Sequence, residues 1–404
     1  MKQGWQKKTL ADVCQIRPPK SEARIRVAPD AFVSFVPMEE LGVDRKFLTP
    51  KQRKPLASVI KGYTYFVDGD VLLAKITPCF ENGKLGIASG LSHGIGFGST
   101  EFFVFRPGSS VDKEYLYYYL SRADFRDEGA ERMGGAVGQQ RVPKEFIENY
   151  PIPVPPLPEQ QRLVGILDKA FAGIATARSN TEKNLQNARA LFESHLQSVF
   201  TRRGEGWVDT ELGDVCGFVR GPFGGSLKKS IFVADGFAVY EQQHAICNQF
   251  DDVRYFIDKA KFKEMKRFEL LPNDLIMSCS GTMGRVAIVP KGIKQGIINQ
   301  ALLKLTPTAS ISSTFLKFWM ESGAFQNALK EYSGGAAIQN VASVKILKEI
   351  RVPLPSINEQ EHVVDKLDDL RKETRSIEAV YQQKLAALDE LKTSLLHRAF
   401  SGEL

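Results

Sequence analysis

The sequence predicts a mixed α/β protein built from two tandem domains, each followed by one long helix. Three observations support this fold class. The chain has 404 residues, which is too many for one ordinary core and suits two domains of roughly 150 residues with connecting elements. A pattern of residues repeats at a spacing of 200 positions, and an apolar seam with helical spacing follows each copy.

The composition is that of a globular protein. Hydrophobic residues make up 43% of the chain and charged residues 25%, which excludes global disorder. No run of 18 uncharged apolar residues occurs, and no apolar stretch follows the positive charges near the start, so we expect a cytoplasmic protein. A net charge of +7 and a pI near 9.0 are compatible with a polyanionic partner, although many basic proteins bind no nucleic acid.

The cysteines suggest neither a disulfide framework nor a zinc site. They are odd in number and never form a Cys-x-x-Cys pair. We expect reduced, mostly buried thiols at Cys14, Cys79, Cys216, Cys247 and Cys279.

The internal repeat is the most informative feature. The proline-rich segment 152–160 returns at 352–360, so that Pro153, Pro155, Glu159 and Gln160 each recur 200 positions later. Before the proline-rich segment, the same register pairs Leu116 with Leu316. After it, the register continues through the residues that follow 160. The chain is therefore two copies of one unit, each a globular domain followed by a helix.

The repeat sets the expected domain organisation. We assign 1–150 and 204–350 to globular domains, and 151–203 and 351–404 to a proline joint with a long helix. Alternating β-rich segments predict strands at 71–76, 85–88, 102–105, 275–279, 286–289 and 301–305, and aromatic and aliphatic residues at helical spacing predict helices at 113–126 and 313–332.

The two long helices are predicted to pair with each other. Apolar residues after each joint follow alternating steps of four and three, which is typical of a coiled-coil seam. The alternative, in which each helix packs only on its own domain, leaves most of so long a seam uncovered. The predicted pairing residues are Leu163, Leu167, Ile174, Leu185, Leu367, Leu370, Ile377 and Leu388. Replacing Leu367 and Leu370 with Asp is expected to break the pairing and leave each domain folded.

Signatures of catalysis are not found. The chain lacks the Asn/Asp-Pro-Pro-aromatic motif of adenine methyltransferases and the GxxxxGK[ST] loop of ATP motors. The glycine cluster at 94–98 is typical of a turn, and the five histidines have no metal-ligand spacing. We therefore assign no catalytic residue, no metal ligand and no cofactor to this chain.

Basic clusters in loop-like sequence are candidate phosphate contacts, and nearby residues with paired donors and acceptors are candidate base contacts. A solvated surface is the alternative for each cluster. The candidate DNA-binding residues are Arg17, Lys20, Arg24, Arg26, Lys51, Arg53, Lys54, Lys75, Lys84, Arg220, Lys228, Lys229, Gln242, Gln243, His244 and Arg285. Gln139, Gln140, Arg141 and the equivalent Gln339-Asn340 are interpreted as a turn in preference to a DNA contact.

The chain resembles the specificity subunit of Type I restriction-modification systems. The resemblance rests on the proline-rich run into Glu-Gln at 153–160 and its copy ending at 360, on Arg-Gly-Pro-Phe-Gly-Gly-Ser-Leu at 220–227, on Gly-Thr-Met-Gly-Arg-Val-Ala-Ile-Val at 281–289 and on Ala-Phe-Ser-Gly-Glu-Leu at 399–404. It implies a non-catalytic subunit with two target-recognition domains, at 1–150 and 204–350, and an antiparallel pair of helices with pseudo-two-fold symmetry.

The resemblance also implies partners. Such a subunit recruits two methyltransferase subunits and two ATP-driven restriction subunits, on which the methyl donor and ATP bind. The duplication combined with unlike loop sequences predicts binding to a bipartite, asymmetric site on double-stranded DNA, with each domain reading one half. Three alternatives stay open: a related restriction-methylation complex without separate motor subunits, a non-catalytic coiled-coil scaffold, and a nuclease or methyltransferase with unfamiliar motifs. A fragment ending near Gly204 is expected to pair with a second copy of itself and read a palindrome.

Overall fold

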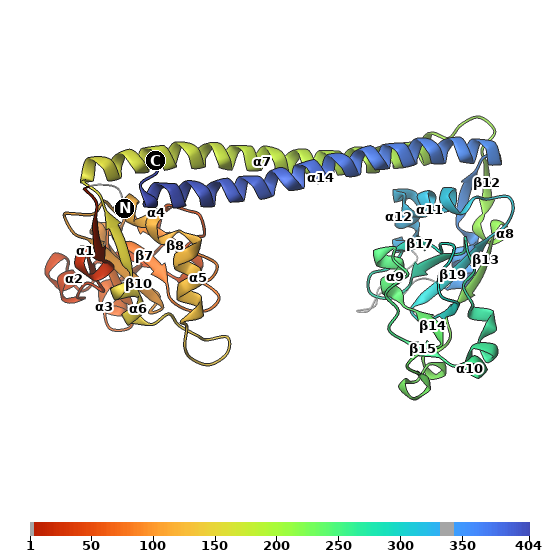
Figure 1. Ribbon diagram of the computed structural model, residues 1–404, viewed down its shortest axis with the longest axis horizontal. Helices are drawn as coiled ribbons and strands as arrows, with labels where there is room; N and C mark the ends of the chain where they lie inside the picture. Colours follow the sequence, from red (N-terminus) through yellow and green to blue (C-terminus); the bar gives the residue numbers. More distant parts are fainter. Residues whose placement is uncertain (1–3, 332–342) are drawn as a thin grey trace. The chain divides into compact units, whose positions relative to one another are not determined.

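The computed structural model describes residues 4–331 and 343–404, and its elements are labelled in Figure 1. The chain divides into two compact units. Unit 1 contains Met1–Thr181 and Gln383–Leu404, and unit 2 contains Glu182–Gln382. Each unit therefore combines one globular domain with parts of both long helices.

The domain of unit 1 is mixed α/β. A five-stranded sheet has the order β2-β10-β7-β8-β4 and a four-stranded sheet the order β5-β3-β9-β6, and the pairs β3–β9 and β4–β8 are parallel. The strands are β1 (Gln6–Thr9), β2 (Cys14–Ile16), β3 (Phe32–Val36), β4 (Phe47–Leu48), β5 (Gln52–Pro55), β6 (Thr64–Val67), β7 (Val71–Ala74), β8 (Leu85–Ala88), β9 (Ile95–Gly98), β10 (Phe102–Pro107) and β11 (Pro151–Val154). The helices are α1 (Leu10–Val13), α2 (Ser21–Arg26), α3 (Leu56–Val59), α4 (Lys113–Leu120), α5 (Ala123–Glu131), α6 (Lys144–Asn149) and the long α7 (Leu157–Arg202).

The domain of unit 2 repeats this topology. Its four-stranded sheet β13-β19-β16-β17 follows the order of β2-β10-β7-β8, and the parallel pair β14–β18 corresponds to β3–β9. The strands are β12 (Val208–Glu211), β13 (Cys216–Arg220), β14 (Phe237–Tyr240), β15 (Phe256–Ile257), β16 (Leu275–Ser278), β17 (Val286–Ile288), β18 (Gly296–Ile298), β19 (Leu302–Pro307) and β20 (Arg351–Leu354). The helices are α8 (Leu212–Val215), α9 (Gln242–Cys247), α10 (Lys259–Glu264), α11 (Ser313–Glu321), α12 (Gly323–Glu331), α13 (Val344–Glu349) and the long α14 (Ile357–Ser401).

The six predicted strands are all present, because their apolar runs are buried on both faces. The two predicted helices at 113–126 and 313–332 are wrong in one respect, since each is interrupted. The backbone of Arg122 is extended at ψ 143°, which separates α4 from α5. At the equivalent break Ser322 is extended, and its hydroxyl donates to the carbonyl of Trp319.

The thiols are free, as expected. Cys14, Cys216 and Cys279 are buried, and burial raises the pKa of each to about 12. Cys79 is half-buried and Cys247 is exposed. Among the described residues, no helix combines the length and apolar character needed to cross a membrane.

The proline joints are held by the strand that opens each repeat. β11 pairs antiparallel with β1, and β20 pairs with β12 in the same register. Gln160, fully buried at the start of α7, fixes the joint to the domain: its amide oxygen accepts from the Asp112 N–H at 2.8 Å, and its amide nitrogen donates to the carbonyls of Ser110 and Pro155.

Gln360 makes the same three bonds in unit 2, with the Ser312 N–H and the carbonyls of Ser310 and Pro355. The repeated glutamine that ends each proline-rich run is thus a structural clamp. The clamp was not foreseen from the sequence, although the motif that contains it was.

Replacing Gln160 with Leu is expected to destabilise unit 1 by about 2–4 kcal/mol, because three backbone groups lose the partner that the buried Gln160 amide provides. Hydrogen exchange measured by mass spectrometry should show lower protection of unit 1 peptides and unchanged protection of unit 2 peptides. Gln161→Leu is the matched control, because Gln161 is exposed one residue further along the same helix. Equal protection in both variants would contradict the clamp.

The long helices run antiparallel where they meet in each unit. In unit 1, Arg178 of α7 bonds Asp389 of α14, and in unit 2, Arg189 of α7 lies 3.4 Å from Glu378 of α14. The predicted pairing of the helices is confirmed, and at 46 and 45 residues each helix is about 70 Å long.

The C-terminal end of each long helix packs into the domain of the other repeat. Leu396, Ala399 and Phe400 of α14 belong to the core of unit 1, and Leu196 and Phe200 of α7 belong to the core of unit 2. Phe400 packs edge-on against Tyr115 and Tyr119 of α4, as Phe200 packs against Phe315 of α11. Each domain core is therefore completed by the helix that belongs to the other repeat.

The predicted seam residues behave differently from one another. Leu163 and Leu167 lie in the core of unit 1, and Leu367 lies in that of unit 2, so these three pack on a domain as well as on a helix. Ile174, Leu185, Leu370 and Leu388 are half-buried along the helices. Ile377 is 46% exposed, so its assignment to the seam is wrong.

Candidate nucleic-acid interface

Two groups of predicted basic residues lie on the smaller sheet of unit 1. Lys20, Arg24 and Arg26 are exposed on and before α2, and Lys51 and Arg53 are exposed on and before the edge strand β5. α2 contributes Ala23 to the apolar cluster that also contains Val33 of β3, and β5 pairs with β3 at the edge of the sheet. Lys54 differs from these residues, because its ammonium lies 3.5 Å from the centre of the Phe35 ring and the side chain is half-buried.

A second basic group gathers where β2 and β7 end. Arg17 and Lys75 both approach the ring of Phe103, at 5.0 and 5.8 Å from its centre. Glu101 lies between Lys75, at 3.9 Å, and Arg141, which makes two hydrogen bonds to it. Burial lowers the pKa of Lys75, opposed by Glu101 and assisted by the positive charges of Arg17 and Arg141, while the bonds from Arg141 lower the pKa of Glu101.

The loop between α5 and α6, drawn in Figure 1, contacts this second group through Arg141. Gly134 and Arg141 exchange two backbone hydrogen bonds at its base, and the carbonyl of Gln140 accepts from the Thr77 N–H. Val137, at the tip, is 99% exposed. The segment predicted as a turn is thus a turn beside Lys75. Its counterpart in the second repeat, with Gln339 and Asn340, lies outside the described residues.

The remaining lysine candidate of unit 1 has a partner within the protein. Lys84 donates to the Met38 carbonyl at 2.9 Å. It lines a polar hollow of about 830 Å³ together with Arg45, Lys51 and Glu40.

Unit 2 presents its candidates at the equivalent edge. Arg220 ends β13 as Arg17 follows β2, and it leads into the glycine-rich loop 221–226. A Cβ at Gly221 would lie 1.8 Å from the Asn299 carbonyl oxygen, so only glycine fits this close approach. Phe223 in the loop is 92% exposed, and Lys228 and Lys229 follow it on the surface.

Arg285 is exposed beside a turn that is fixed by one hydroxyl. Ser278 Oγ donates to the Thr282 carbonyl at 2.6 Å and accepts from the Arg285 N–H at 3.0 Å. This turn, 279–284, follows β16 as the loop after Lys75 follows β7. Cys279 thus takes the place of Lys75, so the equivalent edges of the two domains carry different side chains.

The three neighbouring polar candidates on α9 have structural roles. His244 is fully buried: its Nδ1 accepts from the Glu241 N–H, which leaves Nε2 to donate to the Asp252 carbonyl at 3.0 Å. The prediction of a base contact at His244 is therefore wrong. Gln242 donates to the Ser280 carbonyl and Gln243 to that of Asp252, but both are half-buried and keep part of the side chain at the surface.

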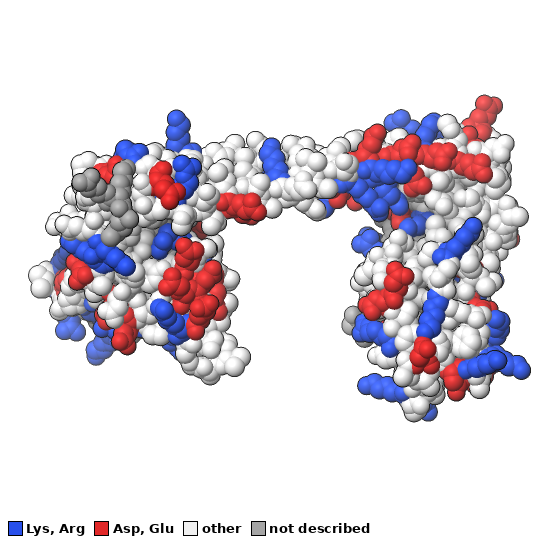
Figure 2. All heavy atoms as spheres, viewed as in Figure 1, with Lys and Arg blue, Asp and Glu red and all other residues white. Residues whose placement is uncertain are grey.

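The surface charge of both domains is mixed. Figure 2 shows Lys and Arg on each domain with Asp and Glu among them. The sequence interpretation placed Arg141 in a turn and gave no role to Phe223, whose exposure within the glycine loop becomes apparent only in the folded structure.

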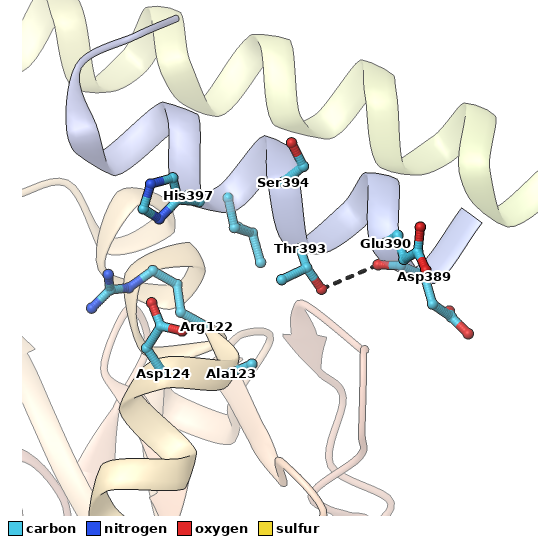
Figure 3. A pocket seen from close by; sticks show the side chains of 9 residues that line it. Arg122, Ala123, Asp124, Asp389, Glu390, Thr393, Ser394 and His397 are labelled. Carbon is cyan, nitrogen blue, oxygen red and sulfur yellow. Dashed lines mark hydrogen bonds between the residues drawn. The ribbon is translucent and has the colours of Figure 1, made fainter. Parts of the chain in front are cut away.

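The pocket drawn in Figure 3 lies within unit 1, between the start of α5 and α14. It has a volume of about 520 Å³ and is lined by Arg122 and Asp124 on one side and by Asp389, Thr393 and His397 on the other. Thr393 bonds the backbone carbonyl of Asp389 one turn earlier, which occupies its hydroxyl in the helix. The hollow marks where α14 rests on the first domain. Among the described residues, no group of His, Cys, Asp and Glu could hold a metal ion.

The comparisons with known proteins agree on one class. The model of the Type I restriction modification DNA specificity domain matches residues 2–186 and again 204–387. The Type I restriction enzyme EcoAI specificity subunit of Escherichia coli is 26% identical over 91% of this chain and 77% of its own length. The EcoEI specificity subunit of the same species is 43% identical over 41% of this chain and 28% of its own length.

Solved structures share the fold. A chain solved to explain complex assembly and conformational transition of the type I R-M system superposes with a TM-score of 0.84 at 20% identity, over 100% of this chain and 99% of that one. The HsdS subunit from Thermoanaerobacter tengcongensis gives 0.64 at 19% identity, over 100% and 98%.

Duplicated α/β domains joined by paired long helices define a class of DNA-specificity proteins without catalytic machinery of their own. The chain belongs to the family of the Type I restriction modification DNA specificity domain and carries that domain twice. It is a specificity subunit of a restriction-modification system and not one of the catalytic subunits.

Proposed function

We propose that the chain recognises a bipartite, asymmetric site on double-stranded DNA, with one half read by each domain. The observation that carries this proposal is the equivalence of the edges at Arg17 and Arg220. Topology and strand register are shared there, whereas the residues that follow the central strand, Lys75 and Cys279, and the loops beyond them differ. Two domains with the same backbone arrangement but different surface side chains are suited to reading two different DNA sequences.

Recruitment of catalytic partners completes the proposed function. Two methyltransferase subunits and the restriction subunits assemble on this chain, and the methyl donor and ATP bind to those partners. The structural neighbour with the TM-score of 0.84 belongs to a type I R-M system whose subunits assemble into a complex, which supports this division of labour. The paired helices offer the long surface that such assembly needs.

Sequencing of methylated bases in cells that carry the chain and its partners tests the proposal. We expect methylation within a split sequence whose two halves differ. Methylation at an uninterrupted or palindromic sequence would contradict it.

Arg17→Ala and Arg220→Ala test the two edges separately. Each variant should weaken binding of the assembled complex to its site by about tenfold and reduce the slope of log K against log salt by about 1, because one phosphate contact is lost. Lys372→Ala is the control, since Lys372 is exposed on α14. A slope that stays the same in both variants would remove these arginines from the interface.

A scaffold without DNA contacts is the second candidate. It is favoured by the intramolecular partners of Lys75 and Lys84, whose charges are partly occupied by Glu101 and a carbonyl. Binding that does not change with salt concentration would support the scaffold, because counterion release would then play no part.

A further inference from the structure

An ion pair joins the two long helices in each unit. In unit 1, Arg178 bonds both carboxylate oxygens of Asp389, with the shortest distance at 3.1 Å. In unit 2, Nε of Arg189 lies 3.4 Å from Oε1 of Glu378. Both pairs link α7 to α14.

The two ion pairs occupy equivalent positions of the repeat. Position 178 is equivalent to 378 in the repeat, and position 189 is equivalent to 389. If each position is replaced by its equivalent in the other repeat, the pair 178–389 becomes the pair 378–189. The residues at these positions are not repeated: the first repeat has Arg at both, and the second has Glu378 and Asp389.

A second pair of positions shows the same exchange. In unit 1 the ammonium of Lys392 lies 5.7 Å from the ring centre of Phe171, and in unit 2 the guanidinium of Arg371 lies 5.1 Å from that of Phe192. Positions 171 and 371 are equivalent, as are 192 and 392. The first repeat supplies both aromatic rings, and the second supplies both cations.

Pairing of like helices would change these contacts. Two first-repeat helices paired in this register would have two contacts in which Arg178 of one helix faces Arg189 of the other. Two second-repeat helices would place Glu378 opposite Asp389, and Arg371 opposite Lys392. Each of these contacts brings like charges together, which destabilises helix pairs by amounts similar to those that opposite charges contribute.

Part of the apolar seam does not distinguish like from unlike helices. Leu167, Leu185 and Leu196 have leucine at the equivalent positions of the second repeat, so those parts of the seam fit like and unlike helices equally well. Discrimination has to come from positions at which the repeats differ, and the four positions above differ in charge.

We propose that positions 171, 178, 189 and 192, with their counterparts in α14, form a pairing code that joins a first-repeat helix to a second-repeat helix and disfavours two helices of the same repeat. The code acts against self-association of a first-repeat fragment, which the repeat alone predicts. It also acts against pairing of α7 with α7 of a second copy of this chain. The proposal does not depend on DNA recognition.

The test starts from the folded full chain. A site for a specific protease is inserted after Gly204, in the exposed connection between the repeats, and the folded protein is cleaved there. Native mass spectrometry then counts unlike pairs and both kinds of like pair. Mixing with an isotope-labelled preparation, with urea raised until labelled and unlabelled halves exchange, ensures that the distribution is at equilibrium.

We expect unlike pairs to exceed their statistical share, with an exchange constant about 30-fold above the random value at low salt. The excess should fall towards the random value between about 0.05 M and about 1 M NaCl, because exposed charges are screened. A random distribution at low salt would overturn the proposal, and so would an excess that does not change with salt.

Two charge-balanced variants sharpen the test. R189E/D389R keeps the net charge but makes each helix complementary to its own kind, so like pairs should now predominate. R178E/R189E/E378R/D389R reverses both ion pairs and keeps the code, so unlike pairs should still predominate. If the two variants give the same distribution, shape rather than charge selects the partner and the proposal fails.

Discussion

Replacing Phe400 with alanine is expected to destabilise unit 1 by about 3–5 kcal/mol, although residue 400 belongs to the second repeat. The Phe400 ring is buried and packs edge-on against Tyr115 and Tyr119 of the first domain. Its loss leaves a cavity in a cluster that also contains Leu163 and Leu396. Hydrogen exchange should increase at 113–131 and stay unchanged at 313–331.

His397→Ala is the matched control for Phe400→Ala. His397 is exposed one turn earlier on α14 and lines the hollow shown in Figure 3. Its replacement should change the stability of unit 1 by less than about 0.5 kcal/mol. If Phe400→Ala increased exchange in unit 2 instead, the crossing of the helix ends would be wrong.

Leu367→Asp is expected to destabilise unit 2 by about 3–5 kcal/mol, because it places an unpaired carboxylate in a buried apolar cluster. Leu367 is fully buried and shares that cluster with Phe315, Trp319 and Leu196. This outcome corrects the expectation that Asp at 367 would separate the helices and leave each domain folded. Urea unfolding followed by the emission of the buried Trp319 measures the loss.

Ile377→Asp provides the comparison on the same helix. Because Ile377 is 46% exposed, the new carboxylate stays in water and the free energy of unfolding should change by less than about 0.5 kcal/mol. Similar losses in the two variants would contradict the difference in burial between Leu367 and Ile377 on which this prediction rests.

The fold was largely predictable because its main signals are local or repeated. Val71–Ala74 and Leu275–Ser278 are continuous apolar runs, and the structure places each in the middle of its sheet. The prolines before residue 157 keep the first joint out of a helix, and Pro158 fits in the first turn of α7. Ile377 was misassigned because a step of three or four residues gives a face of the helix and not the neighbour that covers it.

The candidate site was less predictable, because burial and partners depend on contacts between distant residues. His244 has the donor and acceptor that base recognition requires, but a backbone N–H three residues earlier and a carbonyl eight residues later occupy both ring nitrogens. Arg141 was interpreted as part of a turn, although it shares Glu101 with Lys75. The crossing of the helix ends was also hidden, because a repeat is equally consistent with each helix closing its own domain.

The contact between Tyr115 and Phe400 also sets an order of folding during synthesis. The first domain is made early on the ribosome, but the ring that completes its core follows nearly three hundred residues later. Unit 2, by contrast, closes with residues no later than Gln382. Tyr115 and Tyr119 are thus left open to water or to a chaperone while the second domain is translated. The domain that is translated first is the one that finishes folding last.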